Sequence, residues 1–252
     1  MKTILCIVAR TDSTRLPNKA LLKILEDINL IDLLILRLKK EFNKEHIVLA
    51  TTLSQKDDHL VEIAKKHEIR YYRGDKNNVL DRLINSSANC KECQNIVRIT
   101  GDNPLTDPLI LKKMIVSHEI TKSDYTFTKS IPVGTRAEVL SLKFLNFLSK
   151  NILNKNNTEY MTYYFQKNTG HKKNEFKIDC NQIKSGDNLT IDTKEDLDFI
   201  KEIFYALNNK TFATLDEIIK IINLKKIIKK ESNISSRFIN LDDFNLRNRF
   251  YG

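Results

Sequence analysis

The sequence predicts an α/β fold in which a largely parallel β-sheet is covered by helices. Short β-branched runs alternate with longer amphipathic stretches up to about residue 119, and this alternation is typical of parallel strands joined by helices. A chain of 252 residues is long enough for one large domain of this kind. No apolar run approaches about eighteen residues and the amino terminus shows no secretory signal, so we expect a cytoplasmic protein without a membrane span.

The first half of the chain supplies the regular part of this pattern. The expected strands are the β-branched runs at residues 4–9, 46–51, 69–74 and 95–100. The expected helices follow them, with apolar side chains at helical spacing, at residues 30–42, 57–67, 79–88 and 107–119. In an open parallel sheet the carboxyl ends of such strands border the ligand crevice.

The second half of the chain is less regular, and no repeat or low-complexity linker divides it. After residue 123 we expect a strand at 125–128, a loop, a helix at 141–150, an unassigned segment at 157–167, strands near 175–179 and 188–192, and a helix at 194–207. Residues 1–212 are assigned to one domain. Residues 213–252 are expected to form a further helix, a basic run and a polar tail packed on the same domain.

The formal net charge of +10 raises the possibility of nucleic-acid binding. Lysines are spread through the whole chain, however, and only residues 221–230 concentrate them. Their spacing favours a solvated helix face over a recognition surface, and the lysines concerned are Lys225, Lys226, Lys229 and Lys230. Because no groove-reading helix motif or aromatic stacking set is found, we expect no nucleic-acid partner.

The cysteines do not form a metal or disulfide framework. Only Cys90 and Cys93 have zinc-ligand spacing, and a structural zinc site needs four ligands. Cys6, Cys90, Cys93 and Cys180 are therefore expected to be free thiols, with a zinc hook as the alternative.

The stretch ARTDSTRLPNK at residues 9–19 directly follows the first expected strand. It contains neither of the common glycine-rich phosphate motifs. Arg10, Arg15 and Lys19 nevertheless offer positive charge, while Ser13 and Thr14 offer hydroxyl donors. The stretch is therefore either a phosphate-binding loop or an ordinary exposed basic loop.

Two aspartates each follow a short apolar run. Asp102 lies beyond residues 95–100 in TGDNP, where Gly101 allows a tight turn, and Asp192 ends the run LTID. Two carboxylates from strand ends at one edge of a sheet can share Mg²⁺, which prefers oxygen ligands. The alternative is that each aspartate only caps a turn or helix, although Thr193 can cap the helix after Asp192.

Six stretches occur in order along about residues 3–205: ARTDSTRLPNKAL, VLATTLSQKDD, YYRGDKNNVLDR, VRITGDNPLTDP, PVGTRAEVL and LTIDTKEDL. Together they resemble the bacterial cytidylyltransferase family of spore coat polysaccharide biosynthesis protein F, which is similar to the CMP-Kdo and CMP-acylneuraminate synthetases. The resemblance implies a nucleotide-diphospho-sugar transferase fold, Rossmann-like with a mainly parallel sheet between helices. It also implies a Mg²⁺-dependent enzyme that transfers CMP from CTP to a small anionic acceptor and releases pyrophosphate, for surface polysaccharide biosynthesis.

The resemblance also implies roles for individual residues. It assigns nucleotide binding to Ala9, Arg10, Ser13, Arg15, Lys19, Thr51, Arg73, Gly74, Asp75, Asp81 and Arg98. Asp102 and Asp192 match the Mg²⁺ ligands, and with Arg10 and Lys19 they form the implied catalytic set. The acceptor side is assigned to Arg136, Glu138 and Glu159. Relatives of this kind are commonly dimers, so a homodimer with contacts around residues 130–170 is expected by analogy.

Two positions depart from the family pattern on the acceptor side. Arg136 stands where relatives usually have an acidic residue, and Tyr160 follows Glu159 where a histidine is frequent. An arginine there favours an acceptor with a second negative group, unless Arg136 faces solvent or pairs with Glu138. The competing functions are a glycosyltransferase of similar fold, which usually carries D-x-D where this chain has Asp102–Pro104, and a basic nucleic-acid-binding protein.

Overall fold

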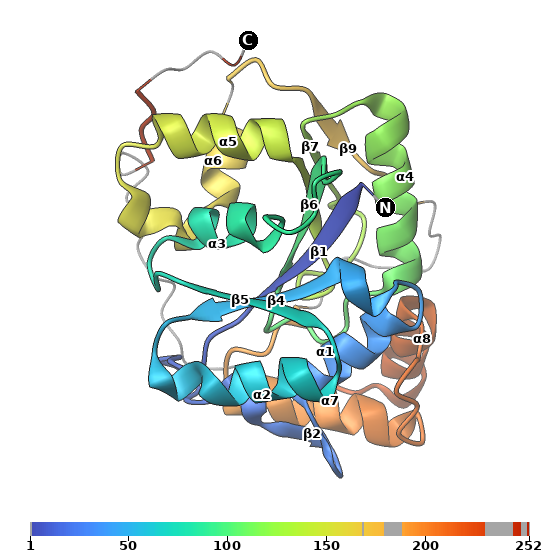
Figure 1. The fold of residues 1–252 in the computed structure, drawn as a ribbon. Coiled ribbons are helices and arrows are strands. Elements are labelled where there is room, and N and C mark those ends of the chain that lie inside the picture. The colour runs from blue at the N-terminus through green and yellow to red at the C-terminus, as the bar shows by residue number, and fades with distance from the viewer. Residues whose placement is uncertain (1, 168, 179–187, 230–243, 248–250, 252) are drawn as a thin grey trace.

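The structure is a computed structural model, and it describes residues 2–167, 169–178, 188–229, 244–247 and 251. The described residues form a seven-stranded sheet in the order β5-β4-β1-β6-β8-β7-β9 (Figure 1). Four neighbouring strands run parallel, namely β1 (Thr3–Val8), β4 (Ile47–Thr52), β5 (Arg70–Gly74) and β6 (Asn95–Thr100). The predicted parallel half of the sheet is thereby confirmed.

The other strands make the sheet mixed. β8 (Glu138–Ser141) runs antiparallel to both β6 and β7 (Tyr125–Phe127), and β9 (Lys173–Glu175) pairs parallel with β7. The expectation of a loop between β7 and the next helix is wrong for β8, whose Val139 and Leu140 are fully buried in the sheet. The strand expected at 175–179 lies earlier, because residues 173–175 pair with β7; residue 179 lies outside the described part.

Residues 188–192 do not form the expected strand. Leu189 and Ile191 are buried against the helices near the carboxyl terminus. Their backbone N–H groups donate to the carbonyls of Val133 and Asp102, at 2.8 and 3.1 Å. The apolar alternation of this segment therefore reflects burial of two side chains rather than pairing with a neighbouring strand.

Helices cover both faces of the sheet, as predicted. One face packs against α1 (Leu30–Lys39), α2 (Asp58–Lys66) and α4 (Pro108–Thr121). The other packs against α3 (Val79–Ser86), α5 (Leu142–Asn151) and α6 (Thr162–Gln166) (Figure 1). Short 3-10 helices connect these elements: η1 (Lys19–Leu21), η2 (Lys44–His46), η3 (Gln55–Asp57) and η4 (Lys155–Tyr160).

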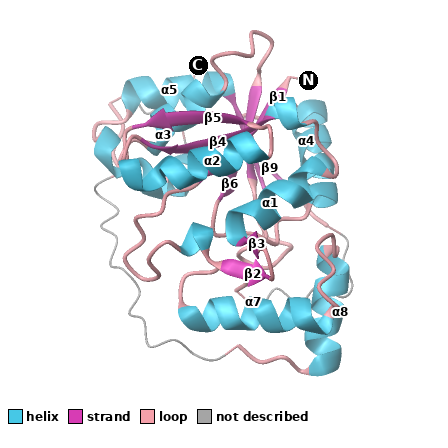
Figure 2. Ribbon diagram, turned by 60° about the horizontal axis from the view of Figure 1, so that its bottom comes forward, coloured by secondary structure: helices cyan, strands magenta, loops and turns pink. Residues whose placement is uncertain are grey.

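A third group of elements packs outside α1 (Figure 2). It consists of the hairpin β2 (Lys23–Leu25) and β3 (Ile28–Asn29), together with α7 (Lys194–Ala206) and α8 (Leu215–Lys225). Thr193 caps α7 in a reciprocal capping box with Asp196. This cap fixes the point at which the chain enters α7 directly after Asp192.

The basic run after α8 departs from expectation. The helix ends at Lys225, because Lys226 adopts a left-handed conformation with φ 48°, so the run is not one helical lysine face. Lys229 instead pairs with Asp196 at 2.6 Å. Lys230 and Cys180 lie outside the described residues, while Cys6, Cys90 and Cys93 are free thiols.

The described residues near the carboxyl terminus lie against the helices on one face of the sheet. Phe244 is buried with α3, α5 and α6, and the Tyr251 hydroxyl donates to Asp124 Oδ1 at 2.8 Å. α8 packs on α7, but the division at residue 213 stays a prediction. Among the described residues, no helix has the length and apolar content needed to cross a bilayer.

Candidate active site

The loop after β1 borders a cavity of about 270 Å³, here named the first cavity. Its other walls come from the end of β6, the start of α3 and η4. Close packing of the strand ends requires Gly101, since a Cβ at this position would lie 2.7 Å from the Cβ of Ala9. The predicted site residues that line the first cavity are Ala9, Arg10, Ser13, Arg15, Lys19, Arg98, Asp102 and Glu159.

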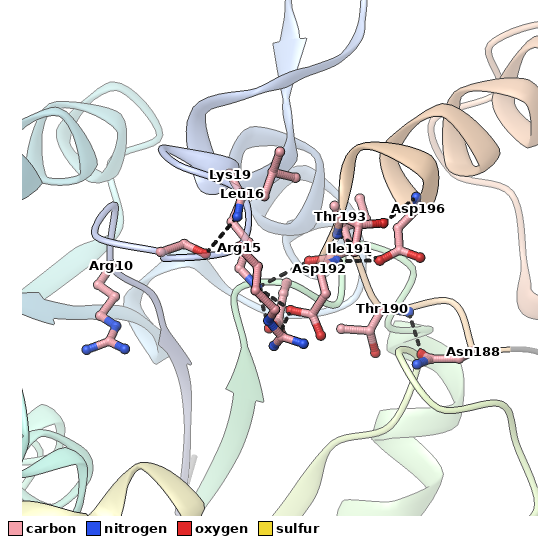
Figure 3. A network of polar contacts seen from close by, with 12 residues as sticks. Arg10, Arg15, Leu16, Lys19, Asn188, Thr190, Ile191, Asp192, Thr193 and Asp196 are labelled. Atoms are coloured by element: carbon pink, nitrogen blue, oxygen red, sulfur yellow. Dashed lines mark hydrogen bonds and ion pairs between the residues drawn. The ribbon is translucent and has the colours of Figure 1, made fainter. Parts of the chain in front are cut away.

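Lys19 is the centre of the polar contacts in this cavity. Its Nζ donates to Asp102 Oδ2 at 2.9 Å. It also donates to Asp192 Oδ1 at 2.9 Å and to the carbonyl of Ile191 at 3.2 Å (Figure 3). Burial acts to lower the pKa of Lys19, but the two carboxylates outweigh it and raise the pKa. Asp102 and Asp192 therefore converge on one atom, although Asp192 arrives from the segment before α7 and not from a strand.

The pKa of Asp102 reflects the same arrangement from the other side. Burial acts to raise it, and the Lys19 ammonium outweighs burial and holds it below its usual value. Asp102 is thus an ionised carboxylate at the end of β6, stabilised by one cation.

The two arginines of the loop are also paired with carboxylates. Arg15 contacts Asp192 and Arg10 contacts Glu159, each at 2.9 Å. Both pairs are partly exposed, so each contributes little to folding stability. An anionic ligand that replaced these carboxylates would find the guanidinium groups already gathered at one cavity.

Asp57 fixes the course of the loop, a role that sequence reasoning missed. Its Oδ1 accepts from the Thr11 N–H and hydroxyl at 2.8 and 2.6 Å. Its Oδ2 accepts from the Thr51 hydroxyl and from the N–H and hydroxyl of Thr52. Burial acts to raise the pKa of Asp57, but hydrogen bonds from Thr11 and Thr52 outweigh it and lower the pKa.

Several residues predicted to bind the nucleoside do not line the first cavity: Thr51, Arg73, Gly74, Asp75 and Asp81. Their roles stay predictions. Thr51 is fully buried and bonds Asp57, whereas Arg73 bonds Asp58 and two backbone carbonyls.

The structure adds Lys76, Val79 and Arg82 to the wall of the first cavity. Arg82 could have been found from helix periodicity. It lies three residues after Val79 and beside Leu83 on the buried side of α3, whereas Asp81 points elsewhere.

A second cavity of about 430 Å³ adjoins the first and shares Arg98, Thr100 and Asp102 with it. Arg136 and Glu138 line it. Arg136 donates from Nε to the Ile131 carbonyl at 2.8 Å and from Nη2 to the Lys129 carbonyl at 3.3 Å. The alternative that Arg136 pairs with Glu138 is wrong, because Glu138 pairs with Arg98 at 2.6 Å.

Gly134 brings the loop between β7 and β8 against the segment that carries Asp192. Its φ is +89°, and a Cβ here would lie 2.1 Å from the Thr190 backbone nitrogen. Only glycine fits such an approach. The loop that lines the second cavity is therefore in direct backbone contact with the segment that carries Asp192.

The family model that matches this chain is that of the cytidylyltransferases, over residues 4–228. The chain belongs to the cytidylyltransferase family. It is therefore a CTP-dependent nucleotidyltransferase, as the six ordered motifs indicated.

Individual relatives agree with this assignment. Spore coat polysaccharide biosynthesis protein SpsF of Bacillus subtilis is 32% identical over 230 residues, which cover 88% of this chain and 95% of SpsF. The structure of a cytidylyltransferase from Leptospira borgpetersenii superposes with a TM-score of 0.83 at 28% identity, covering 93% of this chain and all of that one. CMP-Kdo synthetase complexed with CTP shares the fold, with a TM-score of 0.63 at 15% identity over 81% of this chain and 99% of that one.

Proposed function

We propose that this cytidylyltransferase transfers CMP from CTP to a small anionic acceptor, with Mg²⁺ as cofactor and release of pyrophosphate. The observation that carries the proposal is that Lys19, which lines the first cavity with Asp102 and two loop arginines, binds both Asp102 and Asp192. Asp192 does not itself line the cavity but contacts Lys19 and Arg15 from behind its wall. Positive groups that bind a triphosphate also stabilise the charge that develops on departing pyrophosphate. The CTP complex of CMP-Kdo synthetase supports the choice of nucleotide at the level of the fold.

The residues at Lys19 fit a magnesium ion. Mg²⁺ is usually held by one or two carboxylates together with waters and substrate phosphates. Asp102 and Asp192 supply two such carboxylates, and no cluster of three or more His, Cys, Asp or Glu is found within the described ranges. When bound there, the ion would neutralise phosphate charge. Lys19 would then turn from the carboxylates towards the phosphates.

The acceptor would occupy the second cavity. Arg136 makes no ion pair there with any described residue, whereas the charge of Arg98 is balanced by Glu138. An unbalanced guanidinium favours an acceptor with a carboxylate or phosphate group. Sugar acids, phosphates and phosphonates are the classes concerned, and the name of SpsF supports a role in surface polysaccharide biosynthesis.

The test is direct. The protein is incubated with each nucleoside triphosphate, Mg²⁺ and a panel of acidic sugars, phosphates and phosphonates, and pyrophosphate is measured. We expect release with CTP and only with a matching acceptor. Consumption of a nucleotide sugar without pyrophosphate would instead indicate a glycosyltransferase, and salt-sensitive binding to nucleic acid would indicate the third function. The homodimer is tested separately, by light scattering.

A further inference from the structure

Arg98 lies where the two cavities meet. It is one of the residues, with Thr100 and Asp102, that line both of them. If the nucleotide occupies the first cavity and the acceptor the second, the atoms that react must meet beside these shared residues. This step rests on the proposed function, because it takes the contents of the two cavities from it.

The Arg98 side chain is held firmly on one side. The register of β6 and β8 places Arg98 opposite Glu138, and Nη1 donates to Glu138 Oε2 at 2.6 Å. The other oxygen of Glu138 accepts from the Tyr125 hydroxyl at 2.7 Å and from the Thr162 hydroxyl at 3.1 Å. Both carboxylate oxygens are thus occupied, and the side chains of the ion pair are only 13% and 12% exposed.

The other side of the guanidinium is available. Of the described residues, Glu138 alone accepts a hydrogen bond from Arg98, and Nε is buried without a partner. The second terminal nitrogen, Nη2, is therefore left for a ligand. A guanidinium oriented in advance by a buried carboxylate loses little freedom when it binds a phosphate oxygen.

We propose that Arg98 is a catalytic residue that contacts the α-phosphate of CTP, and that Glu138 positions Arg98 rather than binding the acceptor. In the reaction, an acceptor oxygen forms a bond to the α-phosphorus while the bond from that phosphorus to the α,β-bridging oxygen breaks. Pyrophosphate leaves with the bonding electron pair. An acceptor hydroxyl gives its proton to solvent, whereas a carboxylate or phosphate acceptor has none to give. Arg98 holds the non-bridging α-oxygens throughout and neither gains nor loses a proton.

The test compares three probes that differ only in phosphate: CTP, CMP and cytidine. Binding to the wild type, Arg98→Gln and Glu138→Gln is measured by calorimetry and, for cytidine, by NMR titration. We expect Arg98→Gln to weaken CMP and CTP by about tenfold or more, the scale of one charge-assisted contact, and to leave cytidine unchanged. Glu138→Gln should show the same selective loss to a smaller degree. Arg70→Gln, which removes an arginine of β5 that lines neither cavity, should change none of the three.

Two results would overturn the inference while leaving the proposed function intact. One is unchanged CMP binding in Arg98→Gln, and the other is an equal loss for cytidine, which would indicate a structural role. Should Arg98→Gln fail to fold, Arg98→Lys, which keeps the charge, is tested with the same three probes. We expect it to weaken CMP and CTP binding by a smaller factor and to leave cytidine binding unchanged. Failure of the wild type to bind CTP or to release pyrophosphate would instead refute the proposed function.

Discussion

Asp57→Asn is expected to destabilise the protein strongly, although Asp57 lines neither cavity. Asp57 is only 1% exposed, and its side chain accepts hydrogen bonds from three threonines, Thr11, Thr51 and Thr52. An asparagine keeps one acceptor oxygen but presents an NH₂ group to the donors on the other side. Losing two hydrogen bonds to a charged group, at about 1.5 to 3 kcal/mol each, lowers the free energy of unfolding by about 3 to 6 kcal/mol.

Urea unfolding followed by circular dichroism measures this loss, and Asp58→Asn is the matched control. Asp58 is the next residue, but its side chain is 52% exposed in an ion pair with Arg73, so its removal should change stability by less than about 1 kcal/mol. CTP affinity of folded Asp57→Asn should also fall, because Thr11 anchors the loop that carries Arg10 and Lys19. Equal stabilities for the two variants would refute the reasoning.

The pKa of Asp57 gives the same prediction a pH dependence. Its folded-state pKa is lowered, so its contribution to stability is complete above the unfolded value of about 3.9 and is lost as the pH falls through the folded value. Unfolding at a series of pH values should therefore show a shallower decline below about pH 4 in Asp57→Asn than in the wild type. Parallel curves would contradict this.

The remaining predictions concern the cavities and their support. Asp102→Asn should abolish pyrophosphate release with little change in thermal unfolding, since it keeps size but removes the charge beside Lys19; normal turnover would exclude it as a ligand. Lys19→Ala and Arg10→Ala should each weaken CTP binding in calorimetry by about 1.5 to 3 kcal/mol, and unchanged affinity would return the loop to an ordinary basic surface. Arg136→Ala should raise the KM of the acceptor and leave that of CTP unchanged; equal responses would show that Arg136 does not contact the acceptor. Gly134→Ala should lower the free energy of unfolding, measured in urea, by about 2 kcal/mol or more, because the added Cβ would meet the Thr190 backbone. A smaller loss would show that the backbone around Thr190 can shift to make room for it.

The parallel half of the sheet was predictable because its strands are buried on both faces. Ile4–Ile7 and Ile47–Ala50 are almost entirely buried, and such strands read as continuous apolar runs. β8 was not predictable in this way, since four residues of mixed polarity become a strand only because β6 and β7 supply partners on both sides. Residues 188–192 show the reverse: they alternate like a strand, but none of the described strands pairs with them.

The candidate site was predictable to the extent that it lies in contiguous motifs. Lys19 and Asp102 are recognisable because each lies in a polar stretch that follows an apolar run. Asp57 was not, because its importance depends on the donors that the fold brings to it across tens of residues. An aspartate in SQKDD has the same local sequence whether it is exposed, like Asp58, or buried, like Asp57.

The antiparallel course of β8 separates the loop before it from the strands β1, β4 and β5. Residues 128–137 leave the sheet after β7 and re-enter it at β8, which starts beside the carboxyl end of β6. Residues 128–137 border the second cavity, and the strands on either side of them, β7 and β8, do not pair with β1, β4 or β5. A change in the length or composition of this stretch, with Gly134 kept against Thr190, would therefore remodel one cavity without rebuilding the other. If the second cavity holds the acceptor, as proposed, exchanging this short stretch between relatives would change the choice of acceptor and leave the nucleotide site unchanged.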